Sequence, residues 1–193
     1  MSNKDSFVSY FGYGSLVNRD TRPTDEACVN ATLKGWRRVW NHRVANSDAR
    51  LACTSLSIEP AEGLIQGVLV SIPVEELPAL DEREYGYERL SLDASHFILP
   101  EGASEHTIYV YRSLETNRYI ADTEHPITQS YVDCVKAGYF RRFGEDGLQQ
   151  FLHSTYGWHC PMRKDRHRPT YPRSVSLSDE QYDYFDTLLA SLR

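Results

Sequence analysis

The chain has 193 residues, of which 40% are hydrophobic and 25% are charged, the composition of a globular protein that folds without disulfides or a metal. Its length fits a single domain, and no window of about 18 apolar residues is present that could span a membrane. The formal net charge of −6 argues against general affinity for nucleic acid, which needs Lys and Arg to displace counterions.

The first part of the chain is rich in residues that favour strands. β-Branched and aromatic side chains gather between turn residues, which predicts strands over 7–11, 31–40, 51–58 and 64–72. Gly35 breaks the second of these segments. The fourth is an apolar, β-branched run, which is typical of a buried strand.

A helix is expected next, over residues 73–84. Pro73 opens it, because proline is well tolerated in the first turn of a helix. Pro78 either lies in that first turn or kinks the helix. Two more strands, over 87–99 and 107–111, are expected from their β-branched and aromatic content.

After Pro126 the chain changes character, because apolar residues now recur at helical spacing. Helices are expected over 129–143, 147–156 and 179–192. Ser178 and Gln181 fit a capping box in front of the last of these helices.

Strands first and helices later, with one helix inserted, predict an α+β fold. We expect a twisted, barrel-like mixed β-sheet with an inserted helix and C-terminal helices. In this interpretation the whole chain, 1–193, is one domain, and residues 126–193 are a helical C-terminal elaboration of it.

A glycine loop follows the first expected strand, in the sequence Phe11-Gly12-Tyr13-Gly14-Ser15-Leu16. Glycine permits a positive φ and a close approach of a ligand to the backbone, and such a turn can aim successive N–H groups at an anion. Ser15 adds a hydroxyl that can donate or accept. A small molecule with a carboxylate fits this loop, whereas a plain turn with Tyr13 packed on the core is the alternative. The spacing and the Lys of a phosphate loop are missing.

An acidic residue, Glu84, lies on the apolar face of the inserted helix. Leu77, Leu80 and Glu84 are spaced i, i+3 and i+7, so they share a face if the helix continues that far. Because the two leucines should face the core, Glu84 should point inward as well. An inward Glu must be paired, protonated or catalytic.

The surroundings of Glu84 suit a general base. Partial burial, the nearby acids Asp81 and Glu88, and the negative end of the helix would each raise the pKa of its carboxyl group. Arg83 and Arg89 would oppose that rise. A Glu with a raised pKa is a suitable general base. The alternative is an Arg–Glu pair that only closes the helix end.

Together these segments resemble the γ-glutamylcyclotransferase family. Tyr13-Gly14-Ser15-Leu16 after an N-terminal strand resembles the Tyr-Gly-Ser loop of the family, and Gly67-Val68-Leu69-Val70-Ser71-Ile72 resembles the strand before its helix. Leu80-Asp81-Glu82-Arg83-Glu84, followed by Tyr87 and Arg89, resembles its Leu-Asp-x-x-Glu motif. The likeness covers residues 7–111, and the order and spacing of the pieces make it more specific than any one of them.

The resemblance implies a lyase that releases 5-oxoproline from a small γ-glutamyl substrate without a cofactor. Glu84 would remove a proton from the α-ammonium group, the freed amine would attack the δ-carbonyl of the same molecule, and Glu84 would return the proton to the leaving amine. Both reacting groups belong to one substrate, so the enzyme mainly holds a bent conformer. The remaining site residues implied are the N–H groups of Gly14, Ser15 and Leu16, which would bind substrate oxygens, and Tyr13 and Tyr87 as walls or hydroxyl donors.

The resemblance leaves the exact substrate open. Arg83-Glu84 with Gly86-Tyr87, and Gly35-Trp36-Arg37-Arg38, are similar to the glutathione-specific branch, so glutathione is the first expected substrate. Val17-Asn18 departs from that branch by replacing an aromatic residue, and the chain after Pro126 is longer. Other γ-glutamyl peptides, γ-glutamyl amines such as isopeptide-linked lysine, and a non-catalytic module that binds a metabolite or a partner protein stay open.

Two features of the C-terminal part compete for a functional role. The spacing of His153, His159, Cys160 and His167 fits no standard metal site, so we expect no metal. The segment 158–173 is expected to be a loop that packs over the domain. Its basic run 163–168 is favoured as a solvated loop over an RNA or acidic-partner contact or a cover for the pocket mouth.

A cytoplasmic location is expected. The polar start of the chain leads directly into an apolar segment, unlike the order of a secretion signal. The cysteines are scattered without paired spacing, which is typical of reduced thiols. The oligomeric state has no signature in the sequence.

Overall fold

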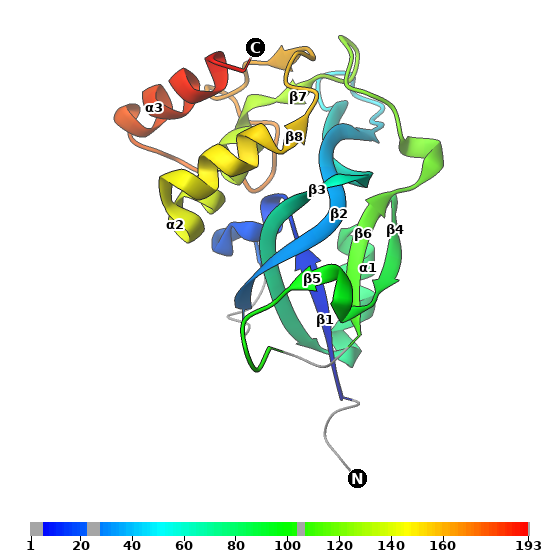
Figure 1. Ribbon diagram of the computed structural model, residues 1–193. Coiled ribbons are helices and arrows are strands. Elements are labelled where there is room, and N and C mark those ends of the chain that lie inside the picture. The colour runs from blue at the N-terminus through cyan, green and yellow to red at the C-terminus, as the bar shows by residue number, and fades with distance from the viewer. Residues whose placement is uncertain (1–5, 23–27, 104–106, 193) are drawn as a thin grey trace.

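The computed structural model describes residues 6–22, 28–103 and 107–192, which form a curved mixed sheet with helices (Figure 1). The sheet runs in the order β4-β6-β1-β3-β2-β5. The bounds of these strands are Phe7–Gly12 (β1), Cys28–Val44 (β2), Cys53–Pro73 (β3), Tyr87–Leu92 (β4), Phe97–Ile98 (β5) and Ile108–Ser113 (β6). β1 and β6 are parallel, whereas β1–β3, β2–β3, β4–β6 and β2–β5 are antiparallel. The predicted α+β class with a barrel-like mixed sheet is confirmed.

β2 and β3 form one antiparallel hairpin with longer strands than the sequence predicts. β3 joins the third and fourth predicted strands into 21 residues, and β2 continues through Gly35. Gly35 has a φ of 80°, and the register shifts between Lys34 and Trp36. The glycine is therefore a bulge inside the strand, because a single irregular residue can be absorbed by a paired strand.

The strand predicted over 87–99 is divided between the two edges of the sheet. β4 pairs with β6 at one edge and β5 pairs with β2 at the other, and a 3₁₀ turn, Ala94–His96, lies between them. The short connection limits the distance between the edges, because a chain spans at most about 3.5 Å per residue. The sheet must therefore curl, which gives it the barrel-like shape.

The inserted helix is shorter than expected. A 3₁₀ turn, Val74–Glu76, leads into α1, Leu77–Arg83, with Pro78 in the first turn. Leu77 and Leu80 are both buried in the core, as their spacing predicted.

The C-terminal part contains two helices and three two-residue strands. α2 spans Gln129–His153 and bends at Gly144, which has a φ of 69°, so the two predicted helices form one kinked element. α3 spans Asp179–Ala190 and begins with the predicted capping box, because the side chains of Ser178 and Gln181 each accept from the other's backbone N–H. The small strands are β7 (Ile127–Thr128), β8 (Thr155–Tyr156) and β9 (Met162–Arg163). α2 and α3 lie at the same end of the molecule as β7 and β8 (Figure 1).

No helix within the described ranges is both long enough and apolar enough to cross a membrane.

Candidate active site

A small cavity collects residues from β1, the end of α1, β4 and α2. Its walls are Phe11, Gly12, Tyr13, Gly14, Ser15, Leu16, Leu56, Glu84, Tyr87, Tyr111 and Tyr131. The structure therefore brings all the residues assigned to the site from the sequence into one place. These are Tyr13, Gly14, Ser15, Leu16, Glu84 and Tyr87.

The glycines of the loop are explained by close packing. Neither Gly12 nor Gly14 has a positive φ, which differs from the expectation for a nest-like turn. A Cβ atom at Gly12 would lie 2.8 Å from the Cβ of Leu16, and one at Gly14 would lie 3.0 Å from the hydroxyl oxygen of Tyr131. Any larger residue would thus displace side chains that line the cavity.

The loop continues into a single 3₁₀ turn, Ser15–Val17, whose first N–H groups have no acceptor within the turn. Its first internal bond runs from the Val17 N–H to the Gly14 carbonyl at 3.1 Å. The N–H groups of Ser15 and Leu16 precede that bond, as in the first turn of any helix. Both residues line the cavity, so these donors belong to a segment that forms part of its wall.

The hydroxyl groups of two wall tyrosines, Tyr13 and Tyr87, already donate their protons within the protein. The Tyr13 hydroxyl donates to the carbonyl of Tyr111 at 2.6 Å, and the Tyr87 hydroxyl donates to the carbonyl of Leu56 at 2.7 Å. A hydroxyl has one proton and two lone pairs, so each oxygen can still accept a hydrogen bond. Burial raises the pKa of both phenols, which therefore stay neutral. Both residues form part of the cavity wall, as expected, but toward a ligand their hydroxyls act as acceptors and not as donors.

Tyr131 of α2 is a wall residue that sequence reasoning missed. It lies far from the loop along the chain, and only the packing of α2 on the 3₁₀ turn after β1 brings it there. Within the described residues its hydroxyl makes no hydrogen bond, so it is available as a donor. The ring of Tyr171 packs against Tyr131 with centroids 4.9 Å apart. A tyrosine at helical spacing is usually interpreted as a core residue, so no local signal in the sequence identifies Tyr131 as a residue of the site.

Glu84 occupies the position directly after α1. Its N–H still donates to the Leu80 carbonyl at 2.9 Å, and Glu84 lines the small cavity, in agreement with the inward direction predicted from the helix face. The side chain is 17% exposed, and its Oε1 lies 3.3 Å from Nε of Arg83. The inward carboxylate and the alternative Arg–Glu contact at the helix end are thus both present.

Burial raises the pKa of Glu84, and the positive charges of Arg83 and Arg173 partly oppose this rise. The neighbouring acids contribute nothing to it, contrary to the expectation from the sequence. Asp81 accepts from Arg89 and from the Tyr111 hydroxyl. Glu88 pairs with Arg112 and Arg118 instead. Loss of hydration alone therefore favours the neutral acid.

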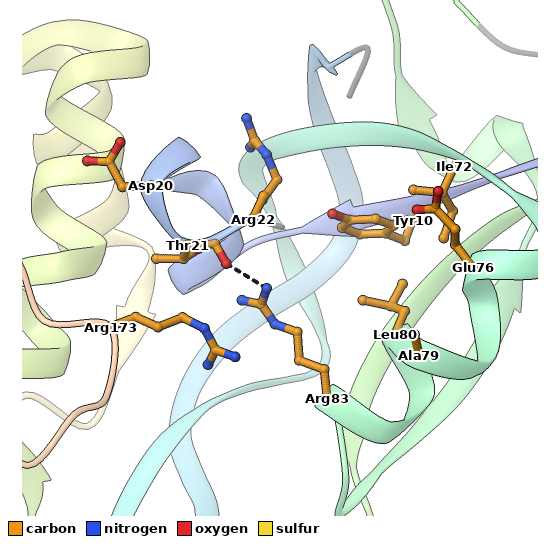
Figure 2. Close-up of a pocket in the computed structure, with 10 residues that line it drawn as sticks. All are labelled: Tyr10, Asp20, Thr21, Arg22, Ile72, Glu76, Ala79, Leu80, Arg83 and Arg173. Atoms are coloured by element: carbon orange, nitrogen blue, oxygen red, sulfur yellow. Dashed lines mark hydrogen bonds between the residues drawn. The ribbon is translucent and has the colours of Figure 1, made fainter. Parts of the chain in front are cut away.

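A second, larger cavity of about 600 Å³ is lined by Arg83, the residue before Glu84 (Figure 2). Its walls are Tyr10, Asp20, Thr21, Arg22, Ile72, Glu76, Ala79, Leu80, Arg83 and Arg173. Arg83 donates to the Thr21 carbonyl at 2.7 Å across this space. Sequence reasoning did not anticipate this cavity, because Arg173 reaches it from beyond α2.

The His- and Arg-rich segment lies apart from both cavities, except for Arg173. In the part of the chain that the structure describes, no group of three or more His, Cys, Asp or Glu side chains is placed to hold a metal ion. Of the basic run, Arg166 pairs with Asp133 and Asp186 at 2.6 Å each. Asp165 is buried and accepts from the N–H of Ser130, which fixes the start of α2.

No protein-family model matches the chain, and no curated protein matches it. Among solved structures, one described as "Gamma-glutamyl cyclotransferase" superposes with a TM-score of 0.61 at 17% identity, over 94% of this chain and 99% of that one. The uncharacterized protein loc79017 from Homo sapiens gives the same values. YkqA from Bacillus subtilis gives a TM-score of 0.59 at 20% identity, over 81% of this chain and 56% of its own. The chain therefore has the fold of a structure described as a gamma-glutamyl cyclotransferase.

Proposed function

We propose that this protein is a γ-glutamylcyclotransferase, which releases 5-oxoproline from a γ-glutamyl compound. The observation that carries the proposal is that Glu84 lines the same cavity as Ser15 and Leu16, whose N–H groups precede the first internal hydrogen bond of the 3₁₀ turn. The shared fold supports it further.

The cavity is complementary to an amino-acid head group. Glu84 and the hydroxyl oxygens of Tyr13 and Tyr87 are acceptors, as an ammonium group requires. The N–H groups of Ser15 and Leu16 are donors, as a carboxylate or a carbonyl oxygen requires. A γ-glutamyl group offers an ammonium, a carboxylate and a carbonyl within one short chain.

Glu84 is the base in the proposed reaction. It takes a proton from the α-ammonium group, and the freed amine forms a bond to the δ-carbonyl carbon of the same molecule. Negative charge develops on the carbonyl oxygen, where loop N–H groups stabilise it. Glu84 then gives the proton to the leaving nitrogen, and the bond from that nitrogen to the carbonyl carbon breaks as the carbonyl re-forms. The ring nitrogen passes its second proton to the released amine, so the products are 5-oxoproline and an ammonium compound. No other reactant is consumed, because the nucleophile is part of the substrate.

Binding requires the cavity to widen. Its volume of about 30 Å³ has room for a few water-sized groups only. Leu16 and Glu84 lie at its wall and are attached to short irregular segments, so rotation of these side chains is the simplest way to admit a glutamyl group.

Glutathione is the first substrate we propose, and γ-glutamyl amines or other γ-glutamyl peptides are the alternatives. We also propose a cytoplasmic location, without nucleic acid or membrane as partner, which is supported by four free cysteines and the net charge of −6. The segment 126–193 is proposed as a C-terminal elaboration of a single domain. It contributes Tyr131 to the site as well as covering the sheet.

A non-catalytic binding module is the second candidate. The specific observation in its favour is the contact between Arg83 and Glu84, which would engage the carboxyl group in a structural pair. A pure binder would retain γ-glutamyl compounds and return them unchanged.

The test is incubation of the protein with glutathione, with γ-glutamyl dipeptides and with γ-glutamyl amines, followed by assay of 5-oxoproline. Release from at least one compound supports the enzyme. Tight binding without release from any of them supports the binding module instead.

A further inference from the structure

The larger cavity beside Glu84 is unusual in its composition, because it combines an arginine cluster with an apolar wall. At about 600 Å³ it lies within the range of small-molecule sites. Tyr10, Ile72 and Leu80 form one side, and all three are buried residues of β1, β3 and α1. Arg83 and Arg173 form the other side (Figure 2).

Arg83 and Arg173 direct their charged ends into the same part of the cavity, although they come from α1 and from the segment before α3 (Figure 2). Arg83 is held there by the Thr21 carbonyl at 2.7 Å. Within the described residues Arg173 makes neither a hydrogen bond nor an ion pair. Two like charges that converge on one space favour an anion between them.

The other charged residues that line the cavity do not neutralise the guanidinium group of Arg173. Asp20 pairs with Arg141 at 2.5 Å. Glu76 lies at the apolar end, next to Ile72 and away from Arg173 (Figure 2). Arg22 donates to the Leu16 carbonyl at 2.9 Å, so its side chain is bound to the glycine loop.

The arginine cluster adjoins the position of the chemistry. Arg83 contacts Glu84 at 3.3 Å, and Glu84 lines the small cavity. The positive charges of both Arg83 and Arg173 also oppose the rise in the pKa of the Glu84 carboxyl group. A substrate with its glutamyl head in the small cavity would extend its leaving part past Glu84 toward these arginines.

We propose that Arg173, together with Arg83, binds a carboxylate on the leaving amine, and that Tyr10, Ile72 and Leu80 receive its apolar side chain. This inference rests on the proposed function and adds to it a position that selects the leaving group by its free carboxylate. Neutral or cationic γ-glutamyl amines lack the anion that the cluster requires. Arg173 is thus a specificity-determining residue.

The test uses two probes that bind without reacting. Glutaryl-leucine and glutaryl-leucinamide lack the α-amine, so neither can cyclise, and they differ only in the leaving-group carboxylate. Calorimetry should give about tenfold tighter binding of the acid than of the amide to the unmodified protein, because hydrogen bonds to charged groups are the strong ones. Arg173→Ala should remove this preference, and Arg173→Lys should retain part of it.

Arg168→Ala is the matched control, since Arg168 is exposed on the same segment and lines neither cavity near Glu84. It should keep the preference in full. Equal affinity of the unmodified protein for the two probes, or failure to bind either, would overturn the proposal, as would a preference that survives Arg173→Ala. Release of 5-oxoproline from γ-glutamyl-leucine is measured separately. A preference for the acid without release would remove the proposed reaction and leave the anion site standing.

Discussion

Nε of Arg38 donates a hydrogen bond of 3.0 Å to the carbonyl oxygen of Tyr13, in the middle of the glycine loop. Arg38 is 1% exposed and also donates to the hydroxyls of Ser154 and Tyr139 and to the carbonyl of Gln66. The Tyr139 hydroxyl donates to the same Tyr13 carbonyl at 2.9 Å. One buried guanidinium thus joins β2 and α2 to the loop that lines the cavity.

Arg38→Lys should destabilise the protein by about 3 kcal/mol, because an ammonium cannot reach all of these acceptors and each buried group left unpaired costs about 1–3 kcal/mol. Urea unfolding measures the change. Arg37→Lys is the control, since Arg37 is half exposed, where it pairs with Glu59 and lies over the ring of Tyr156, and it should change stability by about 0–1 kcal/mol. Equal effects of the two substitutions would contradict a supporting role for Arg38.

Gly14→Ala should reduce turnover by about 10–100-fold while the protein stays folded, because the new methyl group displaces the Tyr131 hydroxyl at the cavity wall. Gly63→Ala is the control, since its Cβ would lie 3.4 Å from the nearest atom, a backbone oxygen, and outside the cavity. Adding Tyr131→Phe to Gly14→Ala should relieve the contact and restore the loop. If Gly14→Ala unfolds the protein, the contact is structural and does not act on the site alone.

Glu84→Gln should stabilise the protein above pH 4.5, the ordinary pKa of this group. The pKa is raised in the folded state, so the unfolded chain loses the proton first, and stability falls as the pH rises through the folded-state pKa. Gln lacks this titration. A gain of about 1 kcal/mol would raise the Tm by about 2–4 °C at neutral pH, with no gain in acid. Since the base must be ionised, kcat/KM of the unmodified enzyme should rise with pH along a limb centred above 4.5.

His42 should make the fold sensitive to acid. It is buried, stacks on Tyr87 with ring centroids 3.8 Å apart, and burial lowers its pKa from 6.5 to about 4. The contribution of neutral His42 to the free energy of unfolding is therefore fully present above pH 6.5. It declines by about 3 kcal/mol as the pH falls toward 4, because the unfolded chain binds the proton more tightly. His42→Phe should flatten this part of the stability curve, while His96→Gln, at an exposed site, should leave it unchanged.

Local pattern was sufficient for the type of most elements and for the two halves of the cavity, but not for the bounds of the long strands or of the split strand over 87–99. The loop from Gly12 to Leu16 follows a short strand, and Leu77 and Leu80 define the face that carries Glu84, so each signal lies within a few residues. The length of β3 was not predictable in this way. Its sequence favours a break between residues 58 and 64, but pairing with β2 keeps the chain extended there.

The remaining site residues come from distant segments. Tyr131 and Arg173 reach the neighbourhood of Glu84 only through the packing of the chain after Pro126. A tyrosine in a helix and an arginine in a loop are ordinary at such positions, so no spacing rule could join them to the loop. The pKa of Glu84 likewise depends on burial, and the nearby acids that the sequence offered as a cause are paired elsewhere.

The central claim is that Glu84 is the base, and the most direct measurement is 5-oxoproline release by Glu84→Gln beside Glu82→Gln. Glu82 lies two residues earlier, is exposed and lines neither cavity, so its substitution controls for the loss of one carboxylate from α1. Glu84→Gln should lower kcat by about 10²–10⁴-fold with an unchanged circular dichroism spectrum, and Glu82→Gln should retain full activity. A Glu84→Gln protein that releases 5-oxoproline at the unmodified rate would contradict the claim.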